Sequence, residues 1–376
     1  MKIVITGSRG FIGRNLVAHL ARQEEVQVFG FDLGQSLTVL EVALAEADIV
    51  FHLAGINRPK SLEEFTKGNV DFTAQVCDML KQTGRPVPFV LSSSIQAERD
   101  NPYGRSKLQA EETIYRYVEE NHAPGIIYRL KNVFGKWCRP NYNSVVATFC
   151  HNIAHDLPIT ISDPANELEL VHVDDVVAHF TNELCFQTQP GVNYRDVMPA
   201  FTVTLGELVQ LLRSFREIRQ TLTLPNLSEL FVCKLYGTYL SYLDKDDFAY
   251  DLQQRCDPRG CLAEFVKSPT AGQIFVSTTK PGITRGNHYH HTKTEKFLVL
   301  QGEALIRFRH IENSEIIEYS VRGEDFRVVD IPPGYTHSIE NIGTGELVTL
   351  FWASEIFNSD IPDTQWLSVF PEGATA

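Results

Sequence analysis

An α/β domain built on a doubly wound parallel sheet, followed by a smaller all-β domain, is the fold class that this sequence of 376 residues predicts. The length exceeds the usual size of one domain, so two hydrophobic cores are expected. From residue 2 to about residue 160, short β-branched runs alternate with longer segments of helical periodicity, as in right-handed βαβ units. After residue 256, short strands follow one another with Gly, Pro and Asn turns, as in a barrel or sandwich. We therefore expect domains at 1–245 and 246–376.

The expected strands of the first domain are KIVITG, VQVFGF, DIVFHLAG, VPFVLSSS and GIIYRL. Residues 62–81 and 103–120 carry the helical pattern between them, and helical segments continue after residue 172. We expect these later helices to complete the first domain. The expected strands of the second domain are QIFVSTT, KFLVLQ, ALIRFRH, IIEYSV, FRVVDI and LVTLFW.

The composition excludes several classes of partner. A net charge of −13 without a Lys/Arg run disfavours nucleic acid and anionic membranes, and no apolar stretch approaches the ~20 residues that span a bilayer. The seven cysteines include no CxxC pair, so neither a disulfide framework nor a thiolate zinc site is expected. We expect a cytoplasmic protein with no nucleic-acid or membrane partner.

The segment TGSRGFIG at residues 6–13 lies between a predicted strand and a predicted helix. Glycines there permit a tight turn and close approach of the backbone to a pyrophosphate at the helix N-terminus. A glycine-rich loop without a ligand is the alternative, which the strand-turn-helix context disfavours. Asp32 ends the second strand, where an acid would bond a ribose hydroxyl and favour NAD, whereas Arg9 could hold the ribose phosphate of NADP. The residues alone leave that choice open.

Three serines end the fourth strand, and the next helix opens with Tyr103 and Lys107 at i and i+4. These two side chains share a helical face, so the ammonium can lower the pKa of the phenol and favour proton transfer at a carbonyl or hydroxyl oxygen. Ser94 can hydrogen-bond the same oxygen. An exposed Tyr/Lys pair is the alternative, but the position after the serine-ended strand favours hydride-transfer chemistry.

These motifs, with FHLAG at 51–55, YRLKNVFG at 128–135 and VHVDD at 171–175, resemble the extended short-chain dehydrogenase/reductase family over about residues 1–245, specifically its nucleotide-sugar enzymes. The resemblance implies a Rossmann-type fold. It implies the catalytic residues Ser94, Tyr103 and Lys107, the substrate residues Arg129 and Asn132, and the cofactor residues Gly7, Arg9, Gly10, Phe11, Ile12, Gly13, Asp32, Asp48, Leu53, Ala54, Gly55, Asn69, Tyr103 and Lys107. Dehydrating members carry an Asp-Glu pair where this chain has Ile95-Gln96-Ala97. Simple reduction of a ketone is therefore expected.

A second constellation consists of His288, His290, Glu295 and His337. Two histidines at i and i+2 of a strand point to one face, and a neighbouring glutamate and a histidine from a later strand can reach the same point. Three nitrogens and one oxygen suit Zn²⁺, Fe²⁺, Mn²⁺ or Ni²⁺. An exposed histidine-rich loop is the alternative.

The spacings Gly282-x5-His288-x-His290-x4-Glu295-x6-Gly302 and Pro332-x-Gly334-x2-His337-x3-Asn341 resemble the two cupin motifs. Phe326 stands where those motifs often have a leading glycine. The resemblance implies a jelly-roll domain that binds one divalent ion at His288, His290, Glu295 and His337, with Zn²⁺ favoured.

The segments DPRGCLAEF at 257–265 and RGNH at 285–288 resemble nucleotide-sugar 3,5-epimerases. That resemblance implies a substrate site lined by Arg259, Glu264 and Arg285, with Lys296 as the enolate-stabilising lysine. His288 then has two interpretations, metal ligand or proton-abstracting base, and a metal-bound imidazole has no free lone pair for a proton. We favour the ligand role, which leaves the base open among His291, His310, Lys293 and Tyr335.

Over nearly its whole length, including KWCRPNYNSVVATFC and TYLSYL, the chain resembles the bifunctional enzymes of UDP-N-acetyl-L-fucosamine biosynthesis in capsule and O-antigen formation. The resemblance implies epimerisation at carbon 3 of UDP-2-acetamido-2,6-dideoxy-4-hexulose by the cupin domain. It also implies reduction with NADPH, rather than NADH, to UDP-2-acetamido-2,6-dideoxy-L-talose, in a homodimer.

Two other functions compete with this interpretation. One is a single-activity 4-keto sugar reductase whose cupin domain only binds metal or mediates assembly. The other is a non-enzymatic, redox-sensing NAD(P)-binding regulator, which is disfavoured because the chain keeps both Tyr103 and Lys107.

Overall fold

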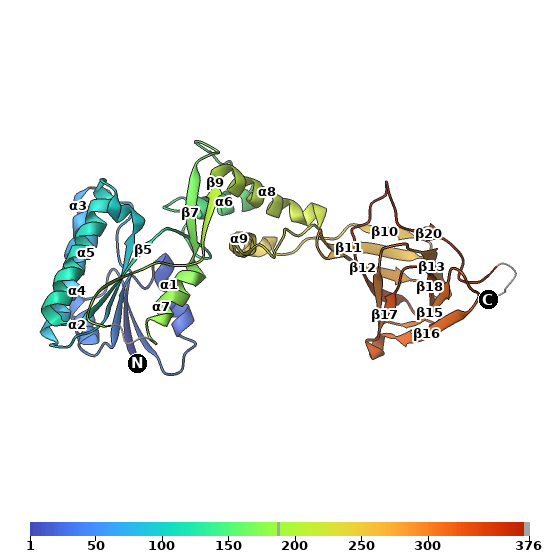
Figure 1. The fold of residues 1–376 in the computed structure, drawn as a ribbon, viewed down its shortest axis with the longest axis horizontal. Helices are drawn as coiled ribbons and strands as arrows, with labels where there is room; N and C mark the ends of the chain where they lie inside the picture. The colour runs from blue at the N-terminus through green and yellow to red at the C-terminus, as the bar shows by residue number, and fades with distance from the viewer. Residues whose placement is uncertain (186–188, 372–376) are drawn as a thin grey trace. The chain divides into compact units, whose positions relative to one another are not determined.

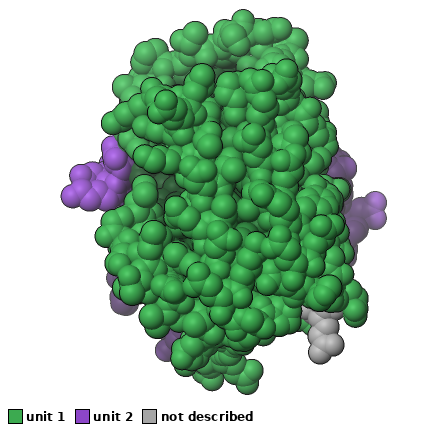
Figure 2. Space-filling model, turned by 90° about the vertical axis from the view of Figure 1, so that its left-hand side faces the viewer, with its two compact units in different colours: residues 1–213, 234–243 green, residues 214–233, 244–376 purple. Residues whose placement is uncertain are grey.

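The computed structural model describes residues 1–185 and 189–371. The chain divides into two compact units (Figures 1 and 2). The first comprises 1–213 and 234–243, and the second comprises 214–233 and 244–376. The division at 243/244 lies close to the expected boundary, but the sequence did not indicate that 214–233 would group with the second unit.

A six-stranded parallel sheet forms the centre of the first unit. In spatial order its strands are β2 (Gln27–Phe31), β1 (Lys2–Thr6), β3 (Ile49–His52), β4 (Phe89–Ser94), β5 (Pro124–Leu130) and β8 (Gly191–Arg195). The apolar runs predicted to be strands form five of the six. The four inner strands among them, β1, β3, β4 and β5, are largely buried on both faces, which explains why they read as continuous hydrophobic segments rather than alternating ones, whereas the edge strand β2 is mostly half-buried.

Helices cover both faces of this sheet (Figure 1). One face carries α2 (Leu37–Ala45), α4 (Phe72–Gln82) and α5 (Pro102–Asn121), and the other carries α1 (Phe11–Leu20) and α7 (Val173–Asn182). The short α3 (Glu63–Phe65) continues through a π-helical turn (Thr66–Asp71) into α4. The predicted doubly wound α/β architecture is confirmed.

A small sheet and three further helices, two of which contain residues of both units, follow β5 in the chain. The sheet has the order β6 (Asn132–Phe134), β7 (Glu167–His172) and β9 (Ala200–Thr204). The remaining helices in this part are α6 (Val145–Ala154), α8 (Leu205–Thr221) and α9 (Leu230–Leu240). The sequence analysis had not predicted this small sheet.

Two antiparallel sheets form the second unit. Their strands are β10 (Gln254–Asp257), β11 (Gly260–Ser268), β12 (Gly272–Thr279), β13 (Thr284–Tyr289), β14 (Glu295–Gln301), β15 (Glu303–His310), β16 (Ile316–Arg322), β17 (Val328–Ile331), β18 (Tyr335–Asn341), β19 (Leu347–Ala353) and β20 (Gln365–Trp366). The orders are β10-β11-β12-β19-β14-β17 and β16-β15-β18-β13-β20. An apolar cluster from both sheets, including Phe297, Ile306, Phe308 and Ile339, fills the core. The predicted all-β domain is confirmed, and its architecture is cupin-like.

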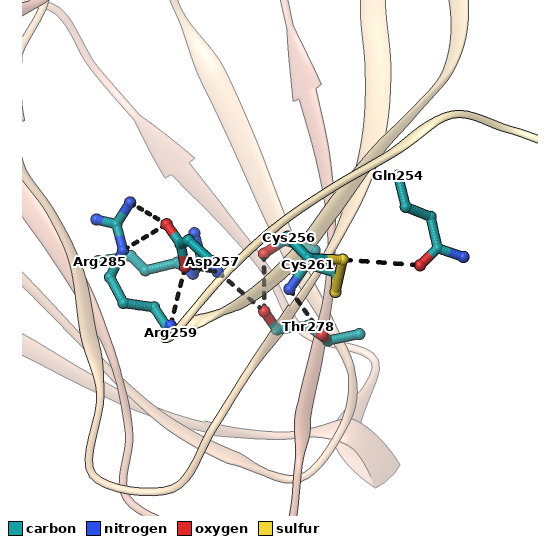
Figure 3. Close-up of a disulfide and its surroundings, with 8 residues drawn as sticks. Gln254, Cys256, Asp257, Arg259, Cys261, Thr278 and Arg285 are labelled. Carbon is teal, nitrogen blue, oxygen red and sulfur yellow. Dashed lines mark hydrogen bonds and ion pairs between the residues drawn. A yellow bond between two sulfur atoms is a disulfide. The ribbon is translucent and has the colours of Figure 1, made fainter.

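One disulfide corrects the expectation drawn from the cysteines. Cys256 and Cys261 are joined across the β10–β11 hairpin, where the strand register sets them directly opposite each other with their Cα atoms 4.1 Å apart (Figure 3). The sequence analysis missed this pair because five positions separate the cysteines, and only the hairpin brings them together.

Among the described residues, no helix has the length and apolar character needed to cross a membrane.

Candidate active sites

The loop that follows β1 depends on glycine for its close packing. Gly7 adopts a φ of +70°, and a Cβ atom there would lie 2.6 Å from the backbone nitrogen of Ala54. A Cβ atom on Gly13 would lie 2.1 Å from the carbonyl oxygen of Gly7. Gly10, the residue before α1, supplies no side-chain hydrogen bond to the first turn of that helix. The first turn is therefore available to an anionic ligand such as a pyrophosphate.

Asn69 joins the loop after β3 to α5. This residue is 2% exposed; its Oδ1 accepts a hydrogen bond from the nitrogen of Ile56 (2.7 Å), and its Nδ2 donates to Ser106 Oγ (2.9 Å). A Cβ atom on Gly55 would lie 3.3 Å from Lys107 Nζ, so the loop passes beside that ammonium. The loop also holds the expected cofactor residues Leu53 and Ala54, and α1 opens with Phe11 and Ile12.

The Asp32 carboxylate joins the loop after β2 to the glycine loop after β1. Its Oδ2 accepts from the Arg9 nitrogen (2.7 Å) and its Oδ1 accepts from the Leu33 nitrogen (2.8 Å). The Arg9 side chain is exposed, and within residues 1–185 and 189–371 it has no hydrogen bond or ion pair. Asp32 and Arg9, which left the choice between NAD and NADP open, therefore lie close together. The Asp32 carboxylate is hydrogen-bonded within the protein, whereas the Arg9 guanidinium is available to a ligand.

Asp48 does not belong to this group, contrary to the expectation. Its Oδ2 accepts from the Lys2 nitrogen at 2.7 Å, and its Oδ1 lies 3.6 Å from an Arg85 guanidinium nitrogen. Lys2 begins β1, whereas Gly7 follows the end of that strand. Asp48 is therefore at the amino edge of the parallel sheet, and the glycine loop is at the carboxyl edge, where ligands of such sheets bind.

Ser94, Tyr103 and Lys107 meet at the carboxyl end of β4. Lys107 is 7% exposed, donates to the Ser92 carbonyl oxygen at 3.0 Å, and places its Nζ 5.9 Å from the centre of the Tyr103 ring. Burial raises the pKa of Tyr103 to about 12, although a hydrogen bond with Ser94 opposes the rise. Burial lowers the pKa of Lys107 to about 8, and the charge of Glu111 opposes that fall.

The expected lowering of the Tyr103 pKa is thus wrong for the protein without a bound ligand. Loss of hydration penalises the phenolate by more than its neighbours stabilise it. A phenol with a pKa near 12 is protonated at neutral pH, which is the state that a proton donor requires.

Glu111 is the residue that the sequence analysis missed at this site. It is 1% exposed and lies one helical turn after Lys107. Its carboxylate accepts hydrogen bonds from Arg129 (2.7 Å to Nη2), from the Tyr194 hydroxyl (3.0 Å) and from Ser93. A buried carboxylate with these partners holds α5 against β4 and β5. The i+4 spacing from Lys107 was the available sequence signal.

Arg129 and Asn132, the two residues expected to line the sugar-nucleotide site, differ in their surroundings. The Arg129 guanidinium makes ion pairs with Glu111 (2.7 Å) and Glu98 (2.8 Å) and stacks 4.8 Å from the Tyr194 ring centre. Its donors are therefore largely engaged within the protein, and its expected substrate role stays a prediction. Asn132 is exposed, and its amide donates to the Glu169 carbonyl oxygen at 3.2 Å.

In the second unit, His288, His290, Glu295 and His337 converge as predicted. One ligand atom from each lies within 4.8 Å of the others, and all but His288 are buried. His288 and His337 are cross-strand partners on β13 and β18. The Nε2 atoms of His290 and His337 are buried without a hydrogen-bond partner in the described residues, 3.5 and 3.7 Å from Glu295 Oε2. Buried, unsatisfied imidazole nitrogens beside a carboxylate fit a bound divalent cation.

The electrostatics of this cluster agree with that donor set. Burial lowers the pKa of His337 to about 3 and also lowers the pKa of His288, so both imidazoles are neutral. Burial works to raise the pKa of Glu295, but the neighbouring His290 imidazole and the charge of Lys293 bring it down to about 2. Neutral imidazoles and an ionised carboxylate are the protonation states that metal coordination requires.

Lys296 lies outside the cluster, contrary to its expected catalytic role. The β14 side chains alternate, so that Glu295 points inward while Lys296 is exposed and paired with Asp330. Lys293, from the connection before β14, places its Nζ 3.3 Å from Glu295 Oε1 and is 11% exposed. Of the two lysines, Lys293 is the one beside the cluster.

The other candidate bases differ in their surroundings. His291 is exposed, whereas the half-buried ring of His310 lies 5.0 Å from the ring of Tyr335. No base is singled out among them by position alone.

The hairpin between β10 and β11 carries a charged cluster (Figure 3). The Asp257 carboxylate pairs with Arg259 (2.6 Å) and lies 3.9 Å from Arg285, and hydrogen bonds from Arg259 lower its pKa to about 2. Glu264 belongs to a different cluster, with Lys267 at 3.1 Å and Arg255 at 3.5 Å. Arg259 and Arg285 thus share Asp257 as a partner, whereas Glu264 pairs with Lys267 and Arg255.

Comparisons with known proteins cover both units. Residues 3–182 match the NAD dependent epimerase/dehydratase family, and residues 255–365 match the polysaccharide biosynthesis C-terminal domain. The UDP-2-acetamido-2,6-beta-L-arabino-hexul-4-ose reductase of Pseudomonas aeruginosa is 45% identical over 374 residues, which cover 100% of both chains.

Solved structures are also similar to this chain, one over almost its whole length and another over part of it. The capsular polysaccharide assembling protein CapF from Staphylococcus aureus is 48% identical, with a TM-score of 0.90 over 98% of this chain and 100% of that one. The UDP-glucuronic acid 4-epimerase from Bacillus cereus is 20% identical, with a TM-score of 0.52 over 57% of this chain and 83% of that one. The second likeness concerns the fold alone.

Proposed function

The chain belongs to the family of the UDP-2-acetamido-2,6-beta-L-arabino-hexul-4-ose reductases, and from this premise we propose that it is a bifunctional nucleotide-sugar enzyme. In the proposal the second unit epimerises carbon 3 of UDP-2-acetamido-2,6-dideoxy-4-hexulose. The first unit reduces the 4-keto group with NADPH and yields UDP-2-acetamido-2,6-dideoxy-L-talose.

The observation that carries the proposal is the cluster of Ser94, Tyr103 and Lys107 beside the glycine loop. Residues 7–13 and 53–55 would hold the dinucleotide, which supplies a hydride to the carbonyl carbon when bound. Tyr103, protonated at neutral pH, would donate its proton to the carbonyl oxygen. Ser94 would hydrogen-bond the same oxygen, and the Lys107 ammonium would stabilise the phenolate left behind.

The arrangement of Arg9, in the glycine loop, and Asp32, just after β2, supports NADPH over NADH. The Asp32 carboxylate already accepts two backbone hydrogen bonds, which reduces its capacity to bind a ribose hydroxyl. The available Arg9 guanidinium suits a ribose 2′-phosphate.

For the second unit, the donor set supports one divalent ion held by His288, His290, Glu295 and His337, with Zn²⁺ as the proposed metal. When bound, such an ion would act as a Lewis acid on a substrate oxygen or would stabilise the fold. Epimerisation further needs a base that removes the proton at carbon 3 and a cation that stabilises the enolate. Lys293 replaces Lys296 as the proposed enolate-stabilising lysine, because it lies beside the cluster. Arg259, Arg285 and Glu264 remain proposed substrate residues.

The proposal is tested with the 4-keto nucleotide sugar and NADPH in D₂O. Because the carbon 3 proton is exchanged with solvent before reduction traps the ketone, we expect deuterium at carbon 3 of the reduced product, read by NMR and mass spectrometry. A reduced product without label would leave only the single-activity reductase. Absence of turnover together with tight cofactor binding would instead support the regulator. The homodimer and the cytoplasmic location stay predictions.

A further inference from the structure

We propose that Asp363 is a positioning residue for the metal ligands of the second unit, so that the C-terminal segment forms part of the metal site. This inference rests on the metal site of the proposed function and extends it to a residue 26 positions beyond His337. Asp363 lies two residues before β20, which pairs with β13 through His288 opposite Trp366.

The Asp363 carboxylate binds the backbone between two ligands. Its Oδ1 accepts from the nitrogen of His291 (2.9 Å), and its Oδ2 accepts from the nitrogens of Thr292 (2.8 Å) and Lys293 (2.9 Å). These three residues belong to the connection from His290 to Glu295. One carboxylate thus sets the course of the chain that separates two of the four ligands.

The carbonyl oxygen of Asp363 acts on a ligand directly. It lies within hydrogen-bond distance of His290 Nδ1. A carbonyl oxygen can only accept, so Nδ1 must carry the proton and Nε2 of the neutral ring must hold the lone pair. Nε2 is the buried atom without a hydrogen-bond partner in the described residues, beside Glu295. The contact therefore selects the tautomer and ring orientation that suit coordination.

Asp363 can perform this role because the segment behind it is firmly held. Arg309, which is 7% exposed, donates to the carbonyl oxygens of Ser368 and Val369, at 2.8 Å in each case. The nitrogen of Val369 donates to Asn287 Oδ1 (3.0 Å), and Thr336 Oγ1 donates to the carbonyl oxygen of Leu367. Residues 367–369 thus fix the segment against β13, β15 and β18.

The experiment compares the full-length protein with Asp363→Ala, Asp363→Asn and the control Asp360→Ala. Asp360 is an exposed acid of the same segment, and its carboxylate has no hydrogen bond or ion pair in the described chain. The affinity for Zn²⁺ is measured by competition with a chromophoric chelator, and the geometry of the site is read from the visible spectrum of the Co²⁺-loaded protein.

We expect Asp363→Ala to weaken Zn²⁺ binding by about 10- to 100-fold and to alter the Co²⁺ spectrum, as loss of a residue that orients ligands does. Asp363→Asn, which keeps one acceptor oxygen, should recover part of the affinity, and Asp360→Ala should stay within about twofold of the unaltered protein. A Zn²⁺ affinity and a Co²⁺ spectrum unchanged in Asp363→Ala would overturn the inference.

Two controls separate this inference from other outcomes. If Asp363→Ala does not fold, the Asp363→Asn variant decides, and an unchanged spectrum there also counts against the inference. If the unaltered protein binds neither ion, the metal site of the proposed function is itself wrong, and the role of Asp363 falls with it.

Discussion

The two candidate sites of this chain are assembled in different ways. In the first unit, Ser94, Tyr103 and Lys107 lie within 14 positions of one another, on the end of one strand and the first turns of the next helix. In the second unit, the four residues of the candidate metal site come from β13, its connection to β14, the start of β14, and β18, and Asp363 comes from a still later segment. A site made from local structure is visible in the sequence, whereas a site made from distant strands is visible only in part.

The sites also use burial differently. Burial opposes the charge of Lys107, and Glu111 offsets that penalty from the same helix. In the second unit burial keeps His288 and His337 neutral, which is the state a metal requires. Desolvation thus disfavours the charged form of Lys107 in the first unit, and in the second unit it favours the neutral histidines that can bind a metal ion.

The largest expected effect tests whether the two sites act independently. Tyr103→Phe removes the proton donor, so NADPH oxidation, followed at 340 nm, should fall by about 10²- to 10⁴-fold. Deuterium exchange at carbon 3 should continue at the rate of the unaltered protein, because the second unit is unchanged. Loss of both activities would show that the sites are not independent.

The next effect concerns the coupling of metal binding to folding. His290→Ala removes a buried ligand, and we expect metal affinity to fall by at least about 100-fold and hydrogen-exchange protection to decrease in residues 254–366. Residues 2–130 should keep their protection. Lys296→Ala is the matched control, since that side chain is exposed, and it should leave both metal content and deuterium exchange at carbon 3 within about twofold. Equal loss of protection in both units would contradict the prediction.

A smaller effect is expected from Glu111→Gln. Lys107 is charged below its pKa of about 8, and the negative charge of Glu111 raises that value. Removing the charge lowers the pKa, so the alkaline limb of the kcat profile should move to lower pH by about 1, with up to about a tenfold loss near pH 8. Glu112→Gln, an exposed neighbour on the same helix, should leave the profile unchanged. A limb that stays in place would show that Glu111 does not act through Lys107.

The smallest effect concerns cofactor choice. Arg9→Ala should raise the KM for NADPH about fivefold, the size expected for an exposed charge pair, and should leave the KM for NADH nearly unchanged. NADH serves as the internal control. Equal changes for both cofactors would show that Arg9 does not contact the ribose phosphate.

The sequence predicted the relative placement of side chains correctly where the periodicity of a single helix or strand decides the geometry. The i and i+4 spacing of Tyr103 and Lys107 and the i and i+2 spacing of His288 and His290 are both realised. The same periodicity argued against Lys296, because Glu295 and Lys296 are neighbours in a strand and must point to opposite faces. The resemblance to nucleotide-sugar 3,5-epimerases had suggested a catalytic role for Lys296 in spite of this alternation.

Other features that the sequence analysis missed depend on how separate segments pair in the fold. Arg129 pairs with Glu111, which lies 18 positions earlier and is buried beside it. Asp48 proved to lie at the opposite edge of the sheet from the glycine loop. Cys256 and Cys261 were joined by the register of a hairpin.

The sequence by itself determined the two fold classes, the glycine loop, the Tyr/Lys pair and the four residues of the candidate metal site, because each follows from a repeat, a spacing or a motif along the backbone. Only the tertiary structure decided the pKa direction of Tyr103, the partner of Arg129 and the place of Asp363 beside His290. These depend on burial and on hydrogen bonds between distant segments, and neither is encoded in the spacing of any one segment.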